Sequence, residues 1–228
     1  MGVGARAAGA KVPRVSIYLI RHGETPGNRD RIVQVPETPL SERGLDQARR
    51  LAERLSAEPI CRILASDLTR ADMTAQALST TLGLGVESEP LLQERNFGDL
   101  RGTPYAELEE DLFGPDFAPP GGETWEAFDQ RVDAAWIRIC SAADGLDGHL
   151  AVVTHGLVLH GLAERHLVLP PEADANPSGG QPRAMGNTCL TIVDFPTVGE
   201  AGSPGRVSLF GCTRHLGTGD GDVGISGI

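Results

Sequence analysis

Several features that mark specialised protein classes are missing from this sequence of 228 residues. Its four cysteines are far apart and form no Cys-x-x-Cys pair, so they fit neither a zinc knuckle nor a redox motif. No apolar stretch approaches the roughly 18 residues that a membrane-spanning helix needs. The segment 1–14 contains basic residues but lacks the apolar part of a secretion signal. These absences predict a cytoplasmic protein without a membrane partner.

Basic residues are scarce compared with acidic ones. The chain has 20 Lys and Arg against 31 Asp and Glu, which gives a net charge of −11. Nucleic acids and anionic membranes are bound through basic surfaces, so this balance argues against both as partners. Lys11 is the single lysine, so nearly every positive charge is a guanidinium, a group that can bind phosphate or carboxylate through two parallel hydrogen bonds.

The remaining composition is that of a globular protein, with 40% hydrophobic and 22% charged residues. The Gly- and Ala-rich segment 1–14 and the Gly-rich segment 216–228 predict flexible ends, because glycine is costly to order. Residues 15–215 are therefore expected to form a single folded domain.

Hydrophobic spacing predicts strands that alternate with helices. Short apolar runs predict buried strands at 15–20, 62–65 and 149–154, and two later segments predict edge or antiparallel strands at 189–195 and 206–212. Amphipathic helices are predicted to begin at Ser41, at Ser66 or Asp67 with an end at Gly83, after Thr124, and near Gly156. This alternation predicts a three-layer α/β/α sandwich with a mostly parallel central sheet.

Polar residues follow the predicted strands at the edge where α/β sheets bind ligands. Arg21-His22-Gly23 follows the first strand, and His155-Gly156 follows the strand at 149–154. Two His-Gly junctions at one edge predict a site. Arg70 falls in the first turn of a helix, where a cation opposes the helix dipole unless an anion lies between them.

Two of these residues have ordinary alternatives. Arg70 could instead pair with Asp67 or Asp72, and a lone glutamate such as Glu94 is usually a solvated surface charge. The other histidines of the chain are assigned to surface or packing roles: His149, His160, His166 and His215.

Taken together, these segments resemble the histidine phosphatase superfamily, also called the phosphoglycerate-mutase-like family. The matching segments occur in the family order: 21–25 (RHGET) with Asn28, 39–44 (PLSERG), 66–71 (SDLTRA), 92–98 (LQERNFG), 121–124 (GGET) and 154–156 (THG). One departure is Val35, because many relatives have glycine after the glutamine that stands here at position 34. The loop that contains Val35 borders the predicted site.

The resemblance implies a role for each matching residue. His22 is the nucleophile that forms a phosphohistidine. Arg21, Arg70 and His155 surround the phosphoryl group. Glu94 is the general acid and then the general base, which requires a pKa raised by burial. Further substrate contacts are implied for Asn28, Gly156 and Leu157, and Glu24 is expected to support the Arg21–His22 loop. The resemblance requires no metal and no cofactor.

Two reactions occur in this family, and the sequence favours hydrolysis over mutase activity. In the cofactor-dependent mutases the second His-Gly is typically followed by Asn-Ser, whereas Leu157 and Val158 follow it here. The segment 102–121 has no Arg or Lys and five acidic residues, which would repel a second phosphate if they faced the site. We therefore expect a phosphatase acting on a small phosphorylated metabolite. A cofactor-dependent phosphoglycerate mutase, a phosphoprotein phosphatase and a non-catalytic phosphate-binding module stay as alternatives, and a homodimer is left open.

Two segments are expected near the predicted pocket. The segment at about 102–123 is expected to form a cap-like insertion, with a helix and a cap over residues 105–123. Its apolar side chains are expected to present a wall to the leaving group: Phe113, Phe117, Pro119 and Pro120. The segment 185–188 is expected to return a loop to the rim, with no assigned role.

Overall fold

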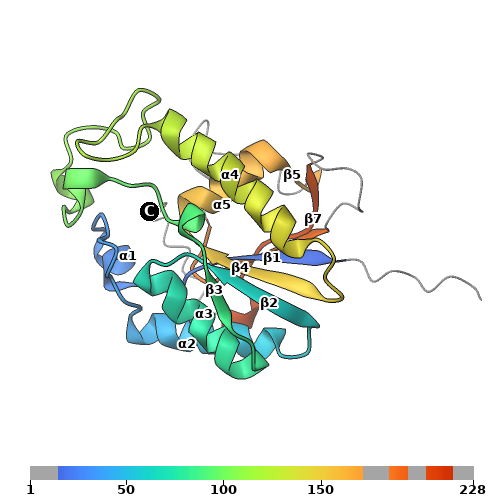
Figure 1. Ribbon diagram of the computed structural model, residues 1–228. Helices are drawn as coiled ribbons and strands as arrows, with labels where there is room; N and C mark the ends of the chain where they lie inside the picture. Colours follow the sequence, from blue (N-terminus) through green and yellow to red (C-terminus); the bar gives the residue numbers. More distant parts are fainter. Residues whose placement is uncertain (1–14, 172–184, 195–203, 218–228) are drawn as a thin grey trace, which may run out of the picture.

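One sheet of seven strands runs through the described part of the protein (Figure 1). The computed structural model describes residues 15–171, 185–194 and 204–217. The strands are β1 (Ser16–Arg21), β2 (Ile60–Ala65), β3 (Val86–Ser88), β4 (His149–Thr154), β5 (Leu167–Val168), β6 (Leu190–Asp194) and β7 (Gly205–Cys212). Their order is β3-β2-β4-β1-β6-β7-β5.

Most of these strands run parallel to their neighbours, as predicted. The pairs β1–β4, β2–β4, β2–β3 and β5–β7 are parallel, whereas β6 is antiparallel to both β1 and β7. The two late strands are therefore antiparallel to each other but lie inside the sheet, because the short strand β5 covers the outer side of β7.

Helices cover both faces of the sheet. The α-helices are α1 (Pro26–Asp30), α2 (Glu42–Leu55), α3 (Thr69–Leu82), α4 (Trp125–Ala143) and α5 (Gly156–His166). Figure 1 shows α4 and α5 on one side of the sheet and α2 and α3 on the other. Alternate residues of β1 point to the two cores: Ile17 and Leu19 pack in the cluster with α4 and α5, and Tyr18 and Ile20 in the cluster with α2 and α3. The predicted three-layer sandwich is confirmed.

The predicted starts are correct for α2, α4 and α5, and the start predicted for α3 is two or three residues too early. Ser41 caps α2 by accepting a hydrogen bond from the Gly44 N–H, and Thr124 caps α4 in the same way. Helix α3 begins at Thr69 rather than at Ser66 or Asp67, because the Ser66 hydroxyl accepts from the N–H of Leu68 and holds the chain in a turn before the helix.

The helix predicted within residues 105–123 does not form, so this prediction is wrong. The segment has one short 3₁₀ turn, η3 (Tyr105–Glu107), followed by turns and extended chain. Three other 3₁₀ turns lie in the described chain: η1 (Pro90–Leu92), η2 (Gly98–Leu100) and η4 (Arg214–Leu216).

Two segments were predicted to be flexible, 1–14 and 216–228. Residues 1–14 and 218–228 lie outside the described residues. Leu216, which the sequence assigned to the tail, is buried in η4. Across the ranges that the structure describes, none of the helices combines the length and the apolar character that crossing a membrane requires.

Glycine at position 44 allows helix α2 to approach the loop that follows β1. A Cβ atom at Gly44 would lie 2.0 Å from the carbonyl oxygen of Glu24, which is closer than atoms can pack. The same Glu24 oxygen accepts a hydrogen bond from the Ser41 N–H at 2.9 Å. The start of α2 and the chain after His22 are therefore held in direct backbone contact.

We expect Gly44→Ala to lower the free energy of unfolding by about 1–3 kcal/mol, because the added methyl group must displace backbone atoms. Urea denaturation measures this change. The control is Gly85→Ala, where a Cβ would meet no atom within 4 Å. Equal stability of the two variants would contradict the close contact.

Candidate active site

The pairing of β1 with β4 brings two buried histidines together. Arg21 lies opposite Thr154 in the parallel register, and the His22 N–H donates to the Thr154 carbonyl at 3.0 Å. The centroids of the His22 and His155 rings are 5.1 Å apart. The two predicted His-Gly junctions therefore meet at one edge of the sheet.

The imidazole of His22 is held in one orientation and one tautomer. Its Nδ1 is 2.7 Å from the carbonyl oxygen of Gly23. Because a carbonyl only accepts hydrogen bonds, the proton is on Nδ1, and Nε2 keeps a lone pair. Burial lowers the pKa of His22 well below its usual value, and the neighbouring cations Arg70 and Arg21 lower it further. The ring is therefore a neutral imidazole near neutral pH.

Two buried arginines supply positive charge beside His22. Arg21 is 1% exposed and Arg70 3% exposed. Arg21 donates to the Met185 carbonyl, and Arg70 donates to the Val35 carbonyl at 3.3 Å. Burial lowers the pKa of Arg70 to about 10, still well above neutral pH.

The alternative ion pair of Arg70 does not form. In the part of the chain that the structure describes, no carboxylate forms an ion pair with Arg70, and its Nε has no hydrogen-bond partner. Asp67 instead accepts from Gln93, and Asp72 accepts from Gln76.

Glu94 is a buried carboxylate rather than a surface charge. One oxygen accepts from the Leu157 N–H at 3.1 Å, at the start of α5, and the other accepts from the Arg95 N–H at 3.0 Å. Burial raises the pKa of Glu94, although these two hydrogen bonds and the charges of Arg70 and Arg21 lower it in part. The N–H of Leu157, expected at the substrate, is directed at Glu94 instead.

His155 is positioned by a residue that the sequence assigned only to a helix start. Its Nε2 is 2.9 Å from the Ser66 hydroxyl, whereas its Nδ1 is buried and has no hydrogen-bond partner among the described residues. Burial, followed by the charge of Arg70, lowers the pKa of His155 well below its usual value.

Helix α1 carries Asn28 to the rim beside His22. Thr25 and Asn28 form a reciprocal capping box, and the Thr25 hydroxyl also donates to Oε1 of Gln34 at 2.7 Å. Because Oε1 accepts this bond, the amide nitrogen of Gln34 points away from Thr25. That nitrogen is buried and has no hydrogen-bond partner within the described ranges.

Glu24 connects the loop after β1 with helix α2. Its carboxylate accepts from the Ser41 hydroxyl at 2.8 Å and from Arg43 at 3.1 Å, and its N–H donates to Gln47 at 2.8 Å. All three partners belong to the start or the body of α2, so Glu24 joins the loop to that helix.

The segment 185–188 contacts the backbone of His22. The Thr188 N–H and the Asn187 side chain both donate to the His22 carbonyl, each at 3.2 Å. Thr188 has a φ of 52°, a left-handed conformation that is unusual for a β-branched residue and is held here by its surroundings. His215, assigned to the surface or packing, is 2.9 Å from the Thr188 hydroxyl.

The His215 ring joins this segment to α2. Its Nδ1 accepts from Arg54 at 3.2 Å, so its Nε2 carries the proton that is donated to Thr188. Burial and the charges of Arg54 and Arg50 lower the pKa of His215 to about 4. Sequence reasoning missed this residue, because no local pattern connects it with the His22 loop.

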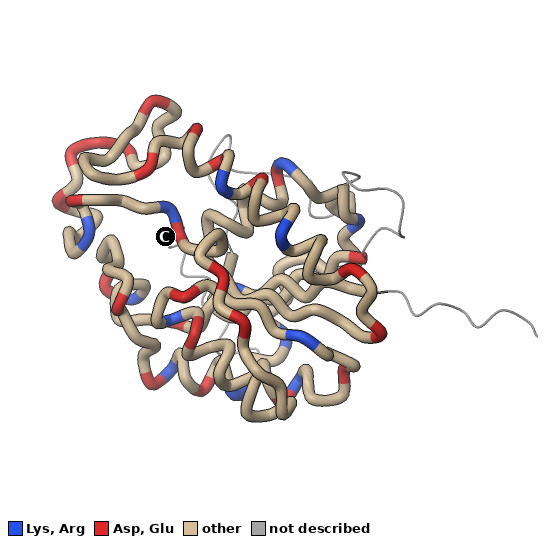
Figure 2. The backbone as a smooth tube through the Cα atoms, viewed as in Figure 1, with Lys and Arg blue, Asp and Glu red and all other residues tan. Residues whose placement is uncertain are grey.

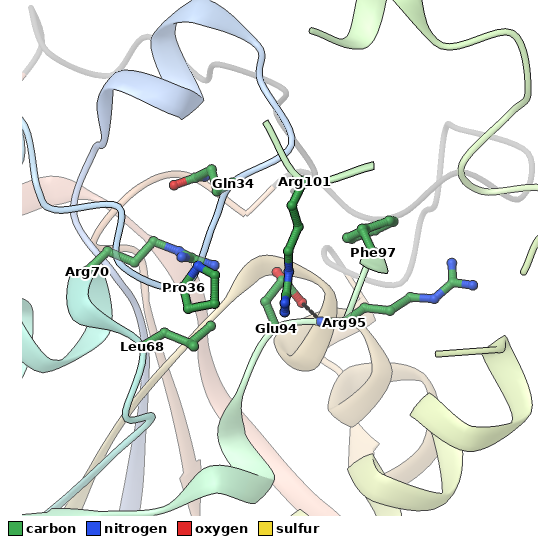
Figure 3. A pocket seen from close by; sticks show the side chains of 8 residues that line it. All are labelled: Gln34, Pro36, Leu68, Arg70, Glu94, Arg95, Phe97 and Arg101. Carbon is green, nitrogen blue, oxygen red and sulfur yellow. Dashed lines mark hydrogen bonds between the residues drawn. The ribbon is translucent and has the colours of Figure 1, made fainter. Parts of the chain in front are cut away.

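A small cavity of about 10 Å³, room for about one water molecule, opens among these groups (Figure 3). Eight side chains line it: Gln34, Pro36, Leu68, Arg70, Glu94, Arg95, Phe97 and Arg101. Figure 3 shows the side chain of Arg101 reaching toward Glu94, whereas the side chain of Arg95 points away.

Arg95 binds the segment that was expected to form the cap. Its guanidinium donates to the carbonyls of Phe117 at 2.7 Å and Glu123 at 3.0 Å, and it lies 3.7 Å from the ring centroid of Trp125. Phe117 is buried in this packing. None of the four side chains expected to form an apolar wall lines this cavity. The structure therefore gives that expectation no support here.

The acidic residues of the segment 102–121 do not face the cavity. All five are exposed and none is among the lining residues: Glu107, Glu109, Glu110, Asp111 and Asp116. Figure 2 shows acidic positions along this segment with no basic position among them. The expected repulsion of a second phosphate by these residues therefore has no support in the structure.

Metal ligands are not grouped in the described ranges: no cluster of three or more His, Cys, Asp or Glu side chains there could hold an ion. The side chains around His22 that carry charge are guanidinium groups and one carboxylate.

The chain matches known proteins over most of its length. Residues 17–201 match the histidine phosphatase superfamily (branch 1). The chain belongs to this superfamily. A curated relative, the probable phosphoglycerate mutase GpmB of Enterobacter sp. (strain 638), is 32% identical over 212 residues, which span 89% of this chain and 95% of the relative.

The solved structures that are similar to this chain include phosphatases. A mycobacterial glucosyl-3-phosphoglycerate phosphatase is 27% identical, with a TM-score of 0.66 and coverage of 86% of this chain and 98% of that one. A putative α-ribazole-5′-P phosphatase of Escherichia coli K-12 is 28% identical, with a TM-score of 0.65 and coverage of 81% and 92%. The superfamily resemblance inferred from the motifs is confirmed.

The structure of this superfamily member gathers most of the predicted site residues. His22, Arg21, Arg70, Glu94 and His155 are all buried at one edge of the sheet, with Asn28, Glu24, Gly156 and Leu157 beside them. Sequence reasoning missed Gln34, Ser66 and Arg101 as site residues. A signal was present for Gln34, which stands next to the departure at Val35.

Proposed function

We propose that this protein is a metal-independent phosphatase that hydrolyses a small phosphomonoester through a phosphohistidine on His22. The observation that carries the proposal is the hydrogen bond from His22 Nδ1 to Gly23, which leaves a lone pair on Nε2 of a neutral ring that two buried arginines influence electrostatically. Superfamily membership and the phosphatases among the solved neighbours support this reaction class.

In the first step, Nε2 of His22 attacks phosphorus and forms an N–P bond while the ester P–O bond breaks. Negative charge is spread over the three other oxygens of the transferring group, and Arg21 and Arg70 offset it without further reorganisation. The buried nitrogens Nε of Arg70, Nε2 of Gln34 and Nδ1 of His155 have no partner in the described ranges, so they suit donation to these oxygens.

Glu94 transfers the protons that both steps need. Its acid form protonates the oxygen of the departing alcohol as the P–O bond breaks. The resulting carboxylate then accepts a proton from the water that attacks the phosphohistidine, which releases inorganic phosphate and restores His22. Burial favours the acid form of Glu94 because it raises the pKa of this group.

We expect His22→Ala to lower the turnover of 4-nitrophenyl phosphate by at least about 10³-fold, because the covalent route is removed. Labelled substrate should give an acid-labile phosphoenzyme in the unaltered protein and none in the variant. His166→Ala, which removes a histidine that contacts Asp133 instead, is the matched control. Activity of His22→Ala near that of the control would exclude His22 as the nucleophile.

We expect Glu94→Gln to lower kcat/KM for propyl phosphate by about 10²–10⁴-fold, because an alkoxide needs protonation to leave. The loss for 4-nitrophenyl phosphate should be much smaller, since that leaving group is stable as an anion. Initial rates of phosphate release measure both values.

The pH dependence gives a second readout for Glu94. The unaltered enzyme should lose kcat/KM for propyl phosphate as pH rises through the raised pKa of Glu94, because the acid form disappears. The pH profile of Glu94→Gln should lack this decrease of kcat/KM at higher pH. An unchanged decrease in the variant, or equal losses of kcat/KM for propyl phosphate and 4-nitrophenyl phosphate, would contradict the acid role.

A phosphoglycerate mutase is the second candidate, favoured by the name of the curated relatives. A mutase must retain a bisphosphorylated intermediate, which requires additional cations near the phosphoryl site. Helix α5 begins here with buried apolar residues, Leu157 and Val158. Among the described residues that line the cavity, Arg101 is a single further cation, since Arg95 is bound to the carbonyls of Phe117 and Glu123. We take one partly buried cation as too little to retain a departing bisphosphate, so we favour hydrolysis.

With 3-phosphoglycerate as substrate, in the presence and absence of 2,3-bisphosphoglycerate, we expect free phosphate as the product. The reason is that a released bisphosphorylated intermediate would not be held long enough to transfer its second phosphate. Phosphate release and formation of 2-phosphoglycerate are measured in the same samples. The isomer without free phosphate would identify a mutase.

A further inference from the structure

Arg101 brings a positive charge to the cavity, and the proposed catalytic steps do not use this charge. It directly follows η2, and its side chain lines the cavity together with those of Arg70 and Glu94 (Figure 3). The residue is only partly buried, so solvent or a substrate can reach it. It belongs to the chain segment that follows Glu94.

The guanidinium of Arg101 lacks an acceptor in the structure. Among the residues that the structure describes, it forms no hydrogen bond and no ion pair. Arg95 differs, because its guanidinium donates to carbonyls of the neighbouring segment and stacks on Trp125. The difference identifies Arg95 as a structural cation and Arg101 as a cation still available to a ligand.

The position of Arg101 also has an electrostatic cost. Its charge repels that of Arg70 and contributes to the lowered pKa of the latter, after the larger effect of burial. Positive charges that line one cavity are stabilised by anions bound there. Arg101 is a positive charge in addition to those that the proposed phosphoryl site uses, so it suits a second anionic group of the ligand.

The cavity is narrow, at about 10 Å³, so a ligand group that lies between Arg70 and Arg101 must displace a lining side chain. Arg101 can rotate outward without breaking a hydrogen bond, whereas moving Arg70 or Glu94 would break contacts with buried backbone groups. A long, partly exposed side chain can then close over a ligand and contact the part that lies farthest from His22.

We infer that Arg101 binds a second anionic group, a carboxylate or a phosphate, on the leaving group of the substrate. The inference rests on the proposed function, in which the phosphoryl group lies against His22 and Arg70 and the ester oxygen faces Glu94. The leaving group then extends from Glu94 toward Arg101. The substrate class is a small phosphomonoester with a second negative charge a few atoms from the ester oxygen.

Matched substrates test this inference. Propyl phosphate has a neutral leaving group, 3-phosphonooxypropanoate has the same chain with a carboxylate, and propane-1,3-diyl bisphosphate carries a second phosphate. We expect the unaltered enzyme to prefer one or both of the anionic compounds by kcat/KM, and the two anionic arms identify which group Arg101 binds.

Arg101→Met keeps most of the side-chain length and removes the charge. We expect it to lower kcat/KM for the preferred anionic compound by about 10- to 100-fold, the effect of losing a charge-assisted hydrogen bond. The loss for propyl phosphate should be much smaller, because its leaving group has no anionic group for Arg101 to contact. Arg101→Lys should restore part of the loss, because it returns the charge without the planar guanidinium.

The control variant is Arg49→Met, which changes the net charge equally at an exposed position on α2. It should leave all three substrates unaffected. A loss in Arg101→Met that is equal for neutral and anionic substrates, or no loss at all, would overturn the inference.

Binding separates this inference from the proposed reaction. Calorimetry with His22→Ala, and with His22→Ala combined with Arg101→Met, measures the affinity for the same compounds without turnover. The inference is supported if the double variant binds the anionic compound more weakly than His22→Ala does, while both bind propyl phosphate equally. This holds even if the chemistry proposed for His22 fails. Equal affinities in the two proteins would refute it even if hydrolysis through His22 is established.

Discussion

The parallel pairing of β1 with β4 is the constraint on which the site depends. Because Arg21 lies opposite Thr154, the two strands end at the same level, and the residues that follow them, His22 and His155, come within ring-contact distance. The strands are buried on both faces, so a shift of the register would carry polar residues into the core. The stability of the sheet and the geometry of the site are thus set by one register.

Burial then determines the electrostatics of this edge. The absence of solvent moves His22 and Glu94 toward their uncharged forms, while Arg70, with a pKa of about 10, stays charged near neutral pH. Buried cations without enough acceptors are costly, and an anionic ligand removes that cost. The same desolvation therefore favours the binding of phosphate, and it gives the proposed nucleophile and acid the protonation states that they need.

Segments distant in sequence hold the loop after β1 in place. Helix α2 contacts it at Gly44 and through Glu24, and the segment 185–188 contacts the carbonyl of His22. Thr188 adopts a left-handed backbone conformation in making this contact. Such conformations persist only where the surrounding structure enforces them, and here His215 and α2 provide that support. The orientation of His22 is therefore a property of several layers of contacts.

The sequence by itself determined the strands, most helix ends and the main site residues, because these depend on local signals. Alternating apolar runs, the caps Ser41 and Thr124, and the His-Gly junctions act over a few residues. Only the tertiary structure decided that Arg95 binds the segment 112–123, that Arg101 enters the cavity and that His215 supports Thr188. The direction of a long side chain depends on which distant backbone groups offer acceptors, and no local spacing encodes them. The segment 105–123 lacks a helix for the same reason, since Arg95 and Trp125 hold it through its carbonyl groups.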